Sequence, residues 1–137
     1  MMTAKEFMVQ IKRAEQELHI IGAKRRHYAD LMMSIGANMS STVISKPTGA
    51  SKTETAAVGL YEMDRQLEEK EKEYTALVKQ AEALIDQLKQ DNFKKVLTYR
   101  YLCDMSWKSI QDEMRYKNEK SVYRCHGSAL DELQKVM

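Results

Sequence analysis

Lysine, arginine, amide and hydroxyl side chains are concentrated in residues 106–126, between apolar residues that recur at helical spacing. Such side chains bind phosphate oxygens, and near the start of a helix they can also read base edges in a major groove. Four side chains are expected to face bases: Glu119, Lys120, Tyr123 and Arg124. Six more are expected to contact phosphates: Ser106, Lys108, Arg115, Lys117, Asn118 and His126.

Three short helices are needed to position these side chains. The helical spacing is found in three segments: 93–102, 107–114 and 122–133. Ser106 and Asn118 are placed to cap the second and third helices, and residues 115–118 form a turn. This is the layout of a helix-turn-helix, whose last helix buries one face and offers the other to DNA. Other three-helix bundles share this periodicity, and Asp112 and Glu119 would repel phosphates.

Other kinds of chemistry find little support. The three histidines, His19, His27 and His126, are scattered, and no Gly-rich phosphate loop or nucleophile elbow is present. Cys103 and Cys125 have no partner at metal-ligand spacing, so two reduced structural thiols are the simpler interpretation. The sequence therefore predicts a protein that is not an enzyme and that uses no metal or other cofactor.

Two long helices are predicted before this segment. The first, from about Thr3 to Met33, begins with the capping-box pair Thr3 and Glu6. Its apolar seam consists of Phe7, Ile11, Ala14, Leu18, Ile21, Tyr28 and Met32, interrupted by Arg25. The second, over about 55–90, has a heptad seam of Leu60, Met63, Leu67, Tyr74, Leu77, Ala81, Leu84 and Leu88, interrupted by Lys70. Antiparallel pairing within one chain or a coiled coil between chains would bury both seams.

A polar segment, residues 34–54, separates the two seams. It is rich in Ser, Thr and Gly, contains the single proline, Pro47, and has no sustained periodicity. About twenty irregular residues are unusual inside a compact domain, so a flexible connector is expected. The predicted organisation is a helical hairpin or coiled-coil region over 1–91, followed by a helix-turn-helix domain over 92–137.

Composition and charge agree with an all-α protein. The 137 residues include one Pro and five Gly, and good helix formers are plentiful. The net charge of +2 is unevenly spread, with +3 in residues 1–57, −4 in 58–92 and +3 in 93–137. The C-terminal third is therefore the better surface for a polyanion. No apolar run reaches the ~18 residues of a membrane span, and no signal-peptide core is present, which favours a cytoplasmic protein without a membrane partner.

The C-terminal third resembles a known DNA-reading domain. KVLTYRYLCDMSWKSIQDEM, residues 95–114, is similar to region 4 of bacterial sigma factors, and VYRCHGSALDEL, residues 122–133, continues the resemblance. The W-x-x-I and VYR-x-HG-x-AL motifs and the Ser/Pro/Gly-rich connector are closer to ArpU/RinA-type phage regulators, in which a sigma-like domain follows long helices. Two departures are a turn one residue longer and Gln111, where a small residue is common.

This resemblance implies a sequence-specific DNA-binding transcriptional regulator of phage type, which activates late genes with RNA polymerase in a bacterial host cell. The family's reading-helix positions fall on the base-facing set given above. Double-stranded DNA and RNA polymerase are thus the expected partners, and no small-molecule substrate is expected. A single module binds DNA non-specifically at only about 10⁻⁴–10⁻⁶ M, so a homodimer through the long helices or tethering to polymerase would be needed.

Two other functions remain open from the sequence. The small subunit of a phage packaging terminase also joins a DNA-recognition helix-turn-helix to a helical oligomerisation arm. A coiled-coil adaptor without nucleic-acid binding would have the same two long seams.

Overall fold

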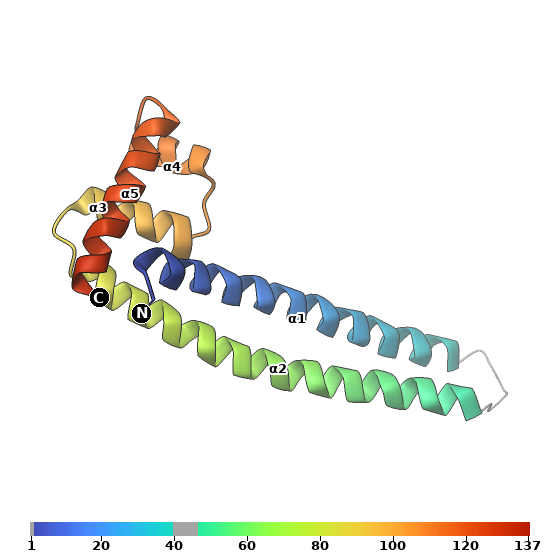
Figure 1. Ribbon diagram of the computed structural model, residues 1–137. Coiled ribbons are helices and arrows are strands. Elements are labelled where there is room, and N and C mark those ends of the chain that lie inside the picture. The colour runs from blue at the N-terminus through green and yellow to red at the C-terminus, as the bar shows by residue number, and fades with distance from the viewer. Residues whose placement is uncertain (1, 40–46) are drawn as a thin grey trace. The chain divides into compact units, whose positions relative to one another are not determined.

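The computed structural model describes residues 2–39 and 47–137, with side chains described for 2–35 and 52–137. Two long helices come first, α1 (Ala4–Met39) and α2 (Pro47–Asp86) (Figure 1). Four shorter elements follow: α3 (Asp91–Leu97), the π-helical turn η1 (Thr98–Leu102), α4 (Trp107–Met114) and α5 (Glu119–Val136). The described residues contain no strand, which confirms the predicted all-α class.

The chain forms two compact units, and α1 and α2 contribute to both. We call Met1–Glu15 together with Glu73–Met137 the head, and Gln16–Lys72 the hairpin unit. This division differs from the boundary expected near residue 91. The difference arises because the start of α1 and the end of α2 supply apolar side chains to the core that holds the four C-terminal elements.

The head has one continuous apolar core. From α1 it contains Phe7, Met8 and Ile11, and Met8 and Ile11 have no exposed surface. From the rest of the head it contains Ala81, Ile85, Leu88, Val96, Leu97, Tyr101, Ile110, Val122, Cys125, Ala129 and Leu133. Full burial of a large apolar side chain contributes about 1.5–3 kcal/mol, so this core is the main stabilising feature of the head.

Polar contacts fix the first turn of α1 within the head. The predicted capping box is confirmed, since Thr3 Oγ1 accepts from the Glu6 backbone and Glu6 Oε2 accepts from the Thr3 backbone, each at 3.1 Å. The Ala4 backbone N–H donates to Gln134 Oε1 at 2.7 Å, and Lys12 pairs with Asp104 at 3.1 Å. The start of α1 is therefore tied both to the end of α5 and to the loop before α4.

In the hairpin unit, α1 and α2 run antiparallel and side by side (Figure 1). Arg25 pairs with Asp64, and Glu17 pairs with Lys70. Later residues of α1 therefore pair with earlier residues of α2, as antiparallel packing requires. Arg25 and Lys70 are the two charged residues that interrupt the predicted seams. Each is half-buried and bonded to a carboxylate of the opposite helix, which explains how an apolar seam accommodates them.

Both long helices extend into the segment predicted as a connector over 34–54. Residues up to Met39 continue α1, and α2 already begins at Pro47, while 40–46 lie outside the described residues. Proline is well tolerated at the first position of a helix, because the N–H that it lacks would have no intrahelical partner there. Each Ser or Thr costs a helix less than about 1 kcal/mol relative to Ala. This cost is small enough for an existing helix to extend through a segment that is rich in these residues.

Candidate nucleic-acid interface

The α4–turn–α5 segment begins each helix with a side-chain cap. Ser106 Oγ accepts a hydrogen bond from the Ser109 backbone at 3.1 Å, and Asn118 Oδ1 accepts one from the Ser121 backbone at 3.0 Å. Arg115 ends α4 in a left-handed conformation, with φ of 60°. Both predicted caps and the predicted turn are therefore confirmed, and α5 is separate from α4 rather than a continuation of it.

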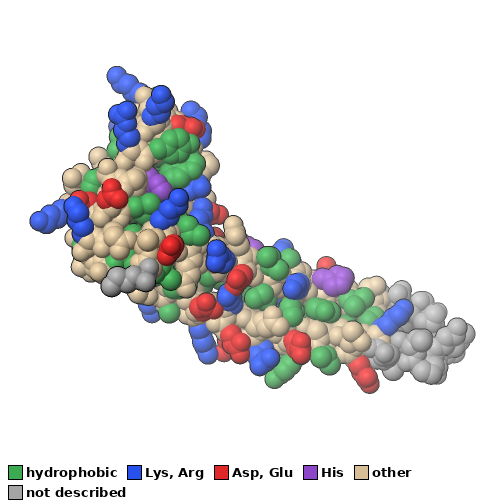
Figure 2. Space-filling view, in the orientation of Figure 1, with side chains coloured by type: hydrophobic (Ala, Val, Ile, Leu, Met, Phe, Trp, Pro, Cys, Tyr) green, Lys and Arg blue, Asp and Glu red, His purple; other side chains and the backbone are tan. Residues whose placement is uncertain are grey.

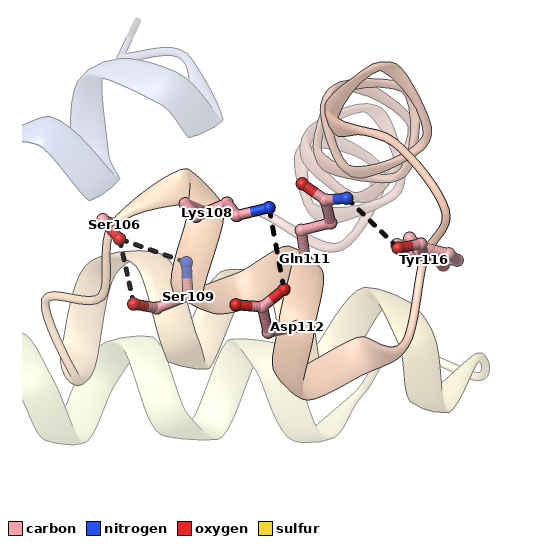
Figure 3. A network of polar contacts seen from close by, with 6 residues as sticks. All are labelled: Ser106, Lys108, Ser109, Gln111, Asp112 and Tyr116. Atoms are coloured by element: carbon pink, nitrogen blue, oxygen red, sulfur yellow. Dashed lines mark hydrogen bonds and ion pairs between the residues drawn. The ribbon is translucent and has the colours of Figure 1, made fainter.

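Gln111 holds the turn in place. Its side chain is only 9% exposed, and its Nε2 donates to the Tyr116 carbonyl at 3.3 Å (Figure 3). A buried amide side chain is costly unless it forms hydrogen bonds, so this bond favours the observed path of the chain after α4. The residue that departs from the sigma-factor pattern thus has a structural role in the turn that follows it.

One face of α5 anchors the helix to the head. Val122, Ala129 and Leu133 have no exposed surface, and Cys125 is 9% exposed, while Leu130 is half-buried. Burial raises the pKa of the Cys125 thiol, so the neutral thiol is favoured. The predicted anchoring face is confirmed, and it leaves the other side of the first two turns of α5 in solvent.

The four residues expected to face bases lie on this solvent side. Glu119, Lys120 and Arg124 are exposed, and Tyr123 is 45% exposed. The Tyr123 hydroxyl donates to Glu119 Oε2 at 3.2 Å, and its ring meets the Trp107 ring edge-on at 5.1 Å between centroids. Tyr123 and Glu119 therefore have defined positions before any ligand is bound.

Some of the residues expected to contact phosphates are exposed, and others already form hydrogen bonds or ion pairs within the protein. Arg115 and Lys117 are exposed, and exposed Lys108 pairs loosely with Asp112 at 3.9 Å. The side chains of Ser106 and Asn118 are used as caps (Figure 3 shows Ser106). Ser106 and Asn118 would therefore assist anion binding chiefly by ordering the helix N-termini, whose backbone amides attract negative charge.

His126, also expected to contact phosphate, is half-buried in a cluster of aromatic rings. Its ring packs against Trp107 at 4.8 Å and Tyr101 at 5.6 Å between centroids, and its Nε2 lies 2.7 Å from the Tyr101 hydroxyl. Burial, with a smaller effect from Arg100 and Lys5, lowers the pKa of His126 to about 4. The imidazole is thus neutral at physiological pH and carries no charge for a phosphate.

Arg100 was not among the predicted site residues, although it belongs to the same cluster. Its guanidinium lies 4.2 Å from the Trp107 ring centroid, and it donates to the Met105 carbonyl at 3.1 Å. η1 makes this possible, since the Cys103 backbone donates to the Thr98 carbonyl five residues earlier, at 2.9 Å. A π-turn shifts the residues after it relative to α-helical spacing, so a 3.6-residue periodicity could not have indicated this contact.

Lys and Arg side chains gather at the end of the head formed by α4, the turn and α5 (Figure 2). Residues 115–124 contain four basic side chains and one acidic one. Beside α5 lies an open pocket of about 310 Å³, whose lining includes Asn92, Tyr116, Ser121, Arg124, Cys125 and Ser128. Arg124 is the one charged side chain of this lining, which makes the hollow mildly attractive to anions.

Within the described residues, no group of three or more His, Cys, Asp or Glu side chains could hold a metal ion. None of the described helices combines the length and apolar character that crossing a bilayer requires. Comparison of the chain with known protein families, with curated proteins and with solved structures finds no match.

Proposed function

We propose that this chain is a sequence-specific DNA-binding transcriptional regulator, in which α4 and α5 act as the two helices of a helix-turn-helix. The observation that carries the proposal is that the first turns of α5 have one buried apolar side and one exposed basic side. Val122 and Cys125 are buried on one side, while Lys120 and Arg124 stand in solvent on the other. A capped helix anchored by one face is suited to enter a major groove about 12 Å wide.

The charge around this helix supports a polyanionic ligand. Four basic side chains against one acidic side chain give residues 115–124 a net charge of +3. Phosphate contacts supply most of the non-specific affinity of proteins for DNA, and each one adds to the salt dependence of binding. Lys108, Arg115 and Lys117 would neutralise phosphates on either side of the groove.

Base contacts would come from the exposed side of α5. Arg124 would pair with a guanine edge, Lys120 with guanine or phosphate, and the Tyr123 ring would pack on a thymine methyl. Glu119 would repel phosphate, and its carboxylate would instead accept a hydrogen bond from a base such as cytosine. The phage and RNA polymerase parts of this proposal rest on the sequence resemblance alone.

The direct test is to sequence the DNA fragments that co-purify with the full chain and to measure binding to the enriched site. We expect saturable, salt-dependent binding that is tighter for this site than for a scrambled duplex. The proposal fails if binding is absent at low salt. Capture of RNA polymerase would support transcription, whereas rings of eight or more copies would favour a packaging terminase subunit.

Arg124→Ala tests the base-reading role of α5. We expect a loss of about 1–3 kcal/mol in binding to the enriched site and a smaller loss on scrambled duplex, measured by fluorescence anisotropy. Lys135→Ala is the matched control, since it removes one exposed cation from the other end of the same helix. Equal losses on both duplexes would reassign Arg124 to a phosphate.

A further inference from the structure

We propose that the Tyr123 hydroxyl is a positioning group that fixes the Glu119 carboxylate to accept a hydrogen bond from one cytosine, and so sets which base is selected at that position of the DNA site. The inference rests on the proposed DNA-binding function and adds to it a group that determines specificity without contacting the base itself. It begins from the surroundings of Glu119, the one acidic side chain among four basic ones in residues 115–124.

Among the described side chains, exposed Glu119 bonds to a neutral hydroxyl and not to one of these cations. Glu119 is the first residue of α5, and Tyr123 lies one helical turn later on the same face. The Tyr123 hydroxyl donates to Glu119 Oε2 at 3.2 Å. Since a carboxylate has two acceptor oxygens, Oε1 remains available to a ligand.

Tyr123 is itself held in place by α4. Its ring meets the Trp107 ring edge-on, with centroids 5.1 Å apart and an interplanar angle of 76°. Trp107 is fixed in turn by the Arg100 guanidinium at 4.2 Å from its ring centroid and by the His126 ring at 4.8 Å between centroids. Partial burial, together with the hydrogen bond to Glu119, raises the pKa of Tyr123, so the hydroxyl keeps the proton that it donates.

A carboxylate held in this way distinguishes between bases because it accepts hydrogen bonds and donates none. In the major groove cytosine presents the N4 amino donor, whereas guanine presents the O6 and N7 acceptors and thymine presents the O4 acceptor. Adenine combines its N6 donor with the N7 acceptor, which would face the negative charge of the carboxylate. Cytosine is therefore the base that Glu119 accepts most readily.

Fixing the carboxylate before DNA binds strengthens this preference. A mobile glutamate loses side-chain freedom when it meets a base, and it can turn towards an exposed cation such as Lys120. Tyr123→Phe removes the hydroxyl and keeps the ring, so the packing on Trp107 and the proposed contact with a thymine methyl remain. We expect this variant to lower the preference for cytosine at one position by about 3–10-fold.

The test is selection by the full chain from a duplex library with a randomised central segment, followed by sequencing of the bound duplexes. The wild type should select cytosine at one position, and Glu119→Ala should lose the preference at that position while keeping the others. Tyr123→Phe should weaken the preference at the same position alone. Adding Tyr123→Phe to Glu119→Ala should have no further effect, because the hydroxyl acts through the carboxylate.

Tyr116→Phe is the matched control, since the Tyr116 hydroxyl is also bonded within the protein, to Cys125, and its removal should leave the cytosine preference unchanged. Circular dichroism should show equal helix content in all variants. Trp107 is the single tryptophan, so equal fluorescence emission of the wild type and Tyr123→Phe would show that the ring at position 123 has stayed in place.

The positioning role is overturned if the wild type selects a site and Tyr123→Phe retains the full preference for cytosine. It is also overturned if Glu119→Ala changes no position of the selected site. An effect of Tyr123→Phe that persists in the Glu119→Ala background would overturn it as well, because the hydroxyl would then contact DNA directly. A wild type that selects no sequence would instead overturn the proposed DNA-binding function, and this inference with it.

Discussion

At the scale of single residues, one cluster links the core of the head to the candidate interface. Trp107 contacts Tyr123 and His126 edge-on and also lies beneath the Arg100 guanidinium. Cation–π and edge-to-face contacts each contribute about 0.5–1.5 kcal/mol beyond area burial. The half-buried Trp107 therefore sets the position of Tyr123 on the exposed face of α5.

The lowered pKa of His126 predicts an acid-sensitive head. The unfolded chain binds a proton at this residue near the ordinary pKa of 6.5, and the folded chain does so only near pH 4. Stability is therefore lost as pH falls from about 6.5 to about 4, because protons favour the unfolded state in that window. Thermal midpoints measured across this range should fall less steeply for His126→Gln than for the wild type.

The matched control for this experiment is His27→Gln, since His27 is exposed and belongs to the hairpin unit. It should leave the pH dependence of the head unchanged. Parallel curves for the wild type and His126→Gln would contradict the assignment of a neutral, half-buried imidazole.

At the scale of elements, the first turns of α1 belong structurally to the C-terminal helices. Phe7, Met8 and Ile11 enter the core that also contains Val122 and Leu133 from α5. The Ala4–Gln134 hydrogen bond and the capping box fix where α1 begins. A fragment that starts near residue 92 would expose this core, so we regard α1 as part of the folding unit that presents α5.

Phe7→Ala should destabilise the head even though it is remote from α5 in sequence. Removing a buried Phe side chain costs about 3–5 kcal/mol, and Phe7 is 3% exposed. Val9→Ala is the control on the same helix, since Val9 is 37% exposed and should cost much less. The readout is denaturant unfolding followed by Trp107 fluorescence, and equal midpoints for the two variants would show that α1 does not support the head.

Two mid-helix glycines of the hairpin unit differ in their surroundings. A Cβ on Gly22 would meet no other group within 4 Å, whereas a Cβ on Gly59 would collide with the Tyr28 ring. Gly22→Ala should therefore stabilise by about 0.5–1 kcal/mol through helix propensity. Gly59→Ala should lose this gain because Tyr28 must move. Amide hydrogen exchange along α1 and α2 would measure the stability of both variants. Equal stabilisation by Gly22→Ala and Gly59→Ala would disprove the close Tyr28–Gly59 packing.

At the scale of the whole molecule, charge and apolar surface are divided between different parts of the chain. Basic side chains gather over α4, the turn and α5, while residues 58–92 carry a net charge of −4. The largest exposed apolar side chains of the long helices lie in the hairpin unit. The proposed DNA-binding function therefore concerns the C-terminal helices and not the acidic part of α2.

Lys108→Ala tests the electrostatic part of DNA binding. Loss of one phosphate contact should weaken binding on every duplex and reduce the slope of log affinity against log salt by about 1. Lys72→Ala is the control, since Lys72 also forms a loose pair with a carboxylate four residues away, in the acidic α2. If the slope is the same for the wild type and Lys108→Ala, Lys108 does not contact phosphate.

The sequence by itself determined the features that depend on neighbouring residues. Helical periodicity predicted the long helices and the anchoring face of α5, and short spacings predicted the Thr3–Glu6 capping box and the Ser106 and Asn118 caps. These features follow from local geometry, because a cap or a helical face involves residues only three or four positions apart.

Only the tertiary structure decided features that depend on distant residues. It placed the start of α1 in the head, paired Arg25 and Lys70 with carboxylates of the opposite helix, and packed half-buried His126 against Tyr101. Each of these contacts joins residues at least 25 positions apart, and the energy of burial depends on what surrounds a side chain in space. A pattern read along one chain segment contains no information about those surroundings, so the sequence could not show that His126 packs among aromatic rings, where burial lowers its pKa.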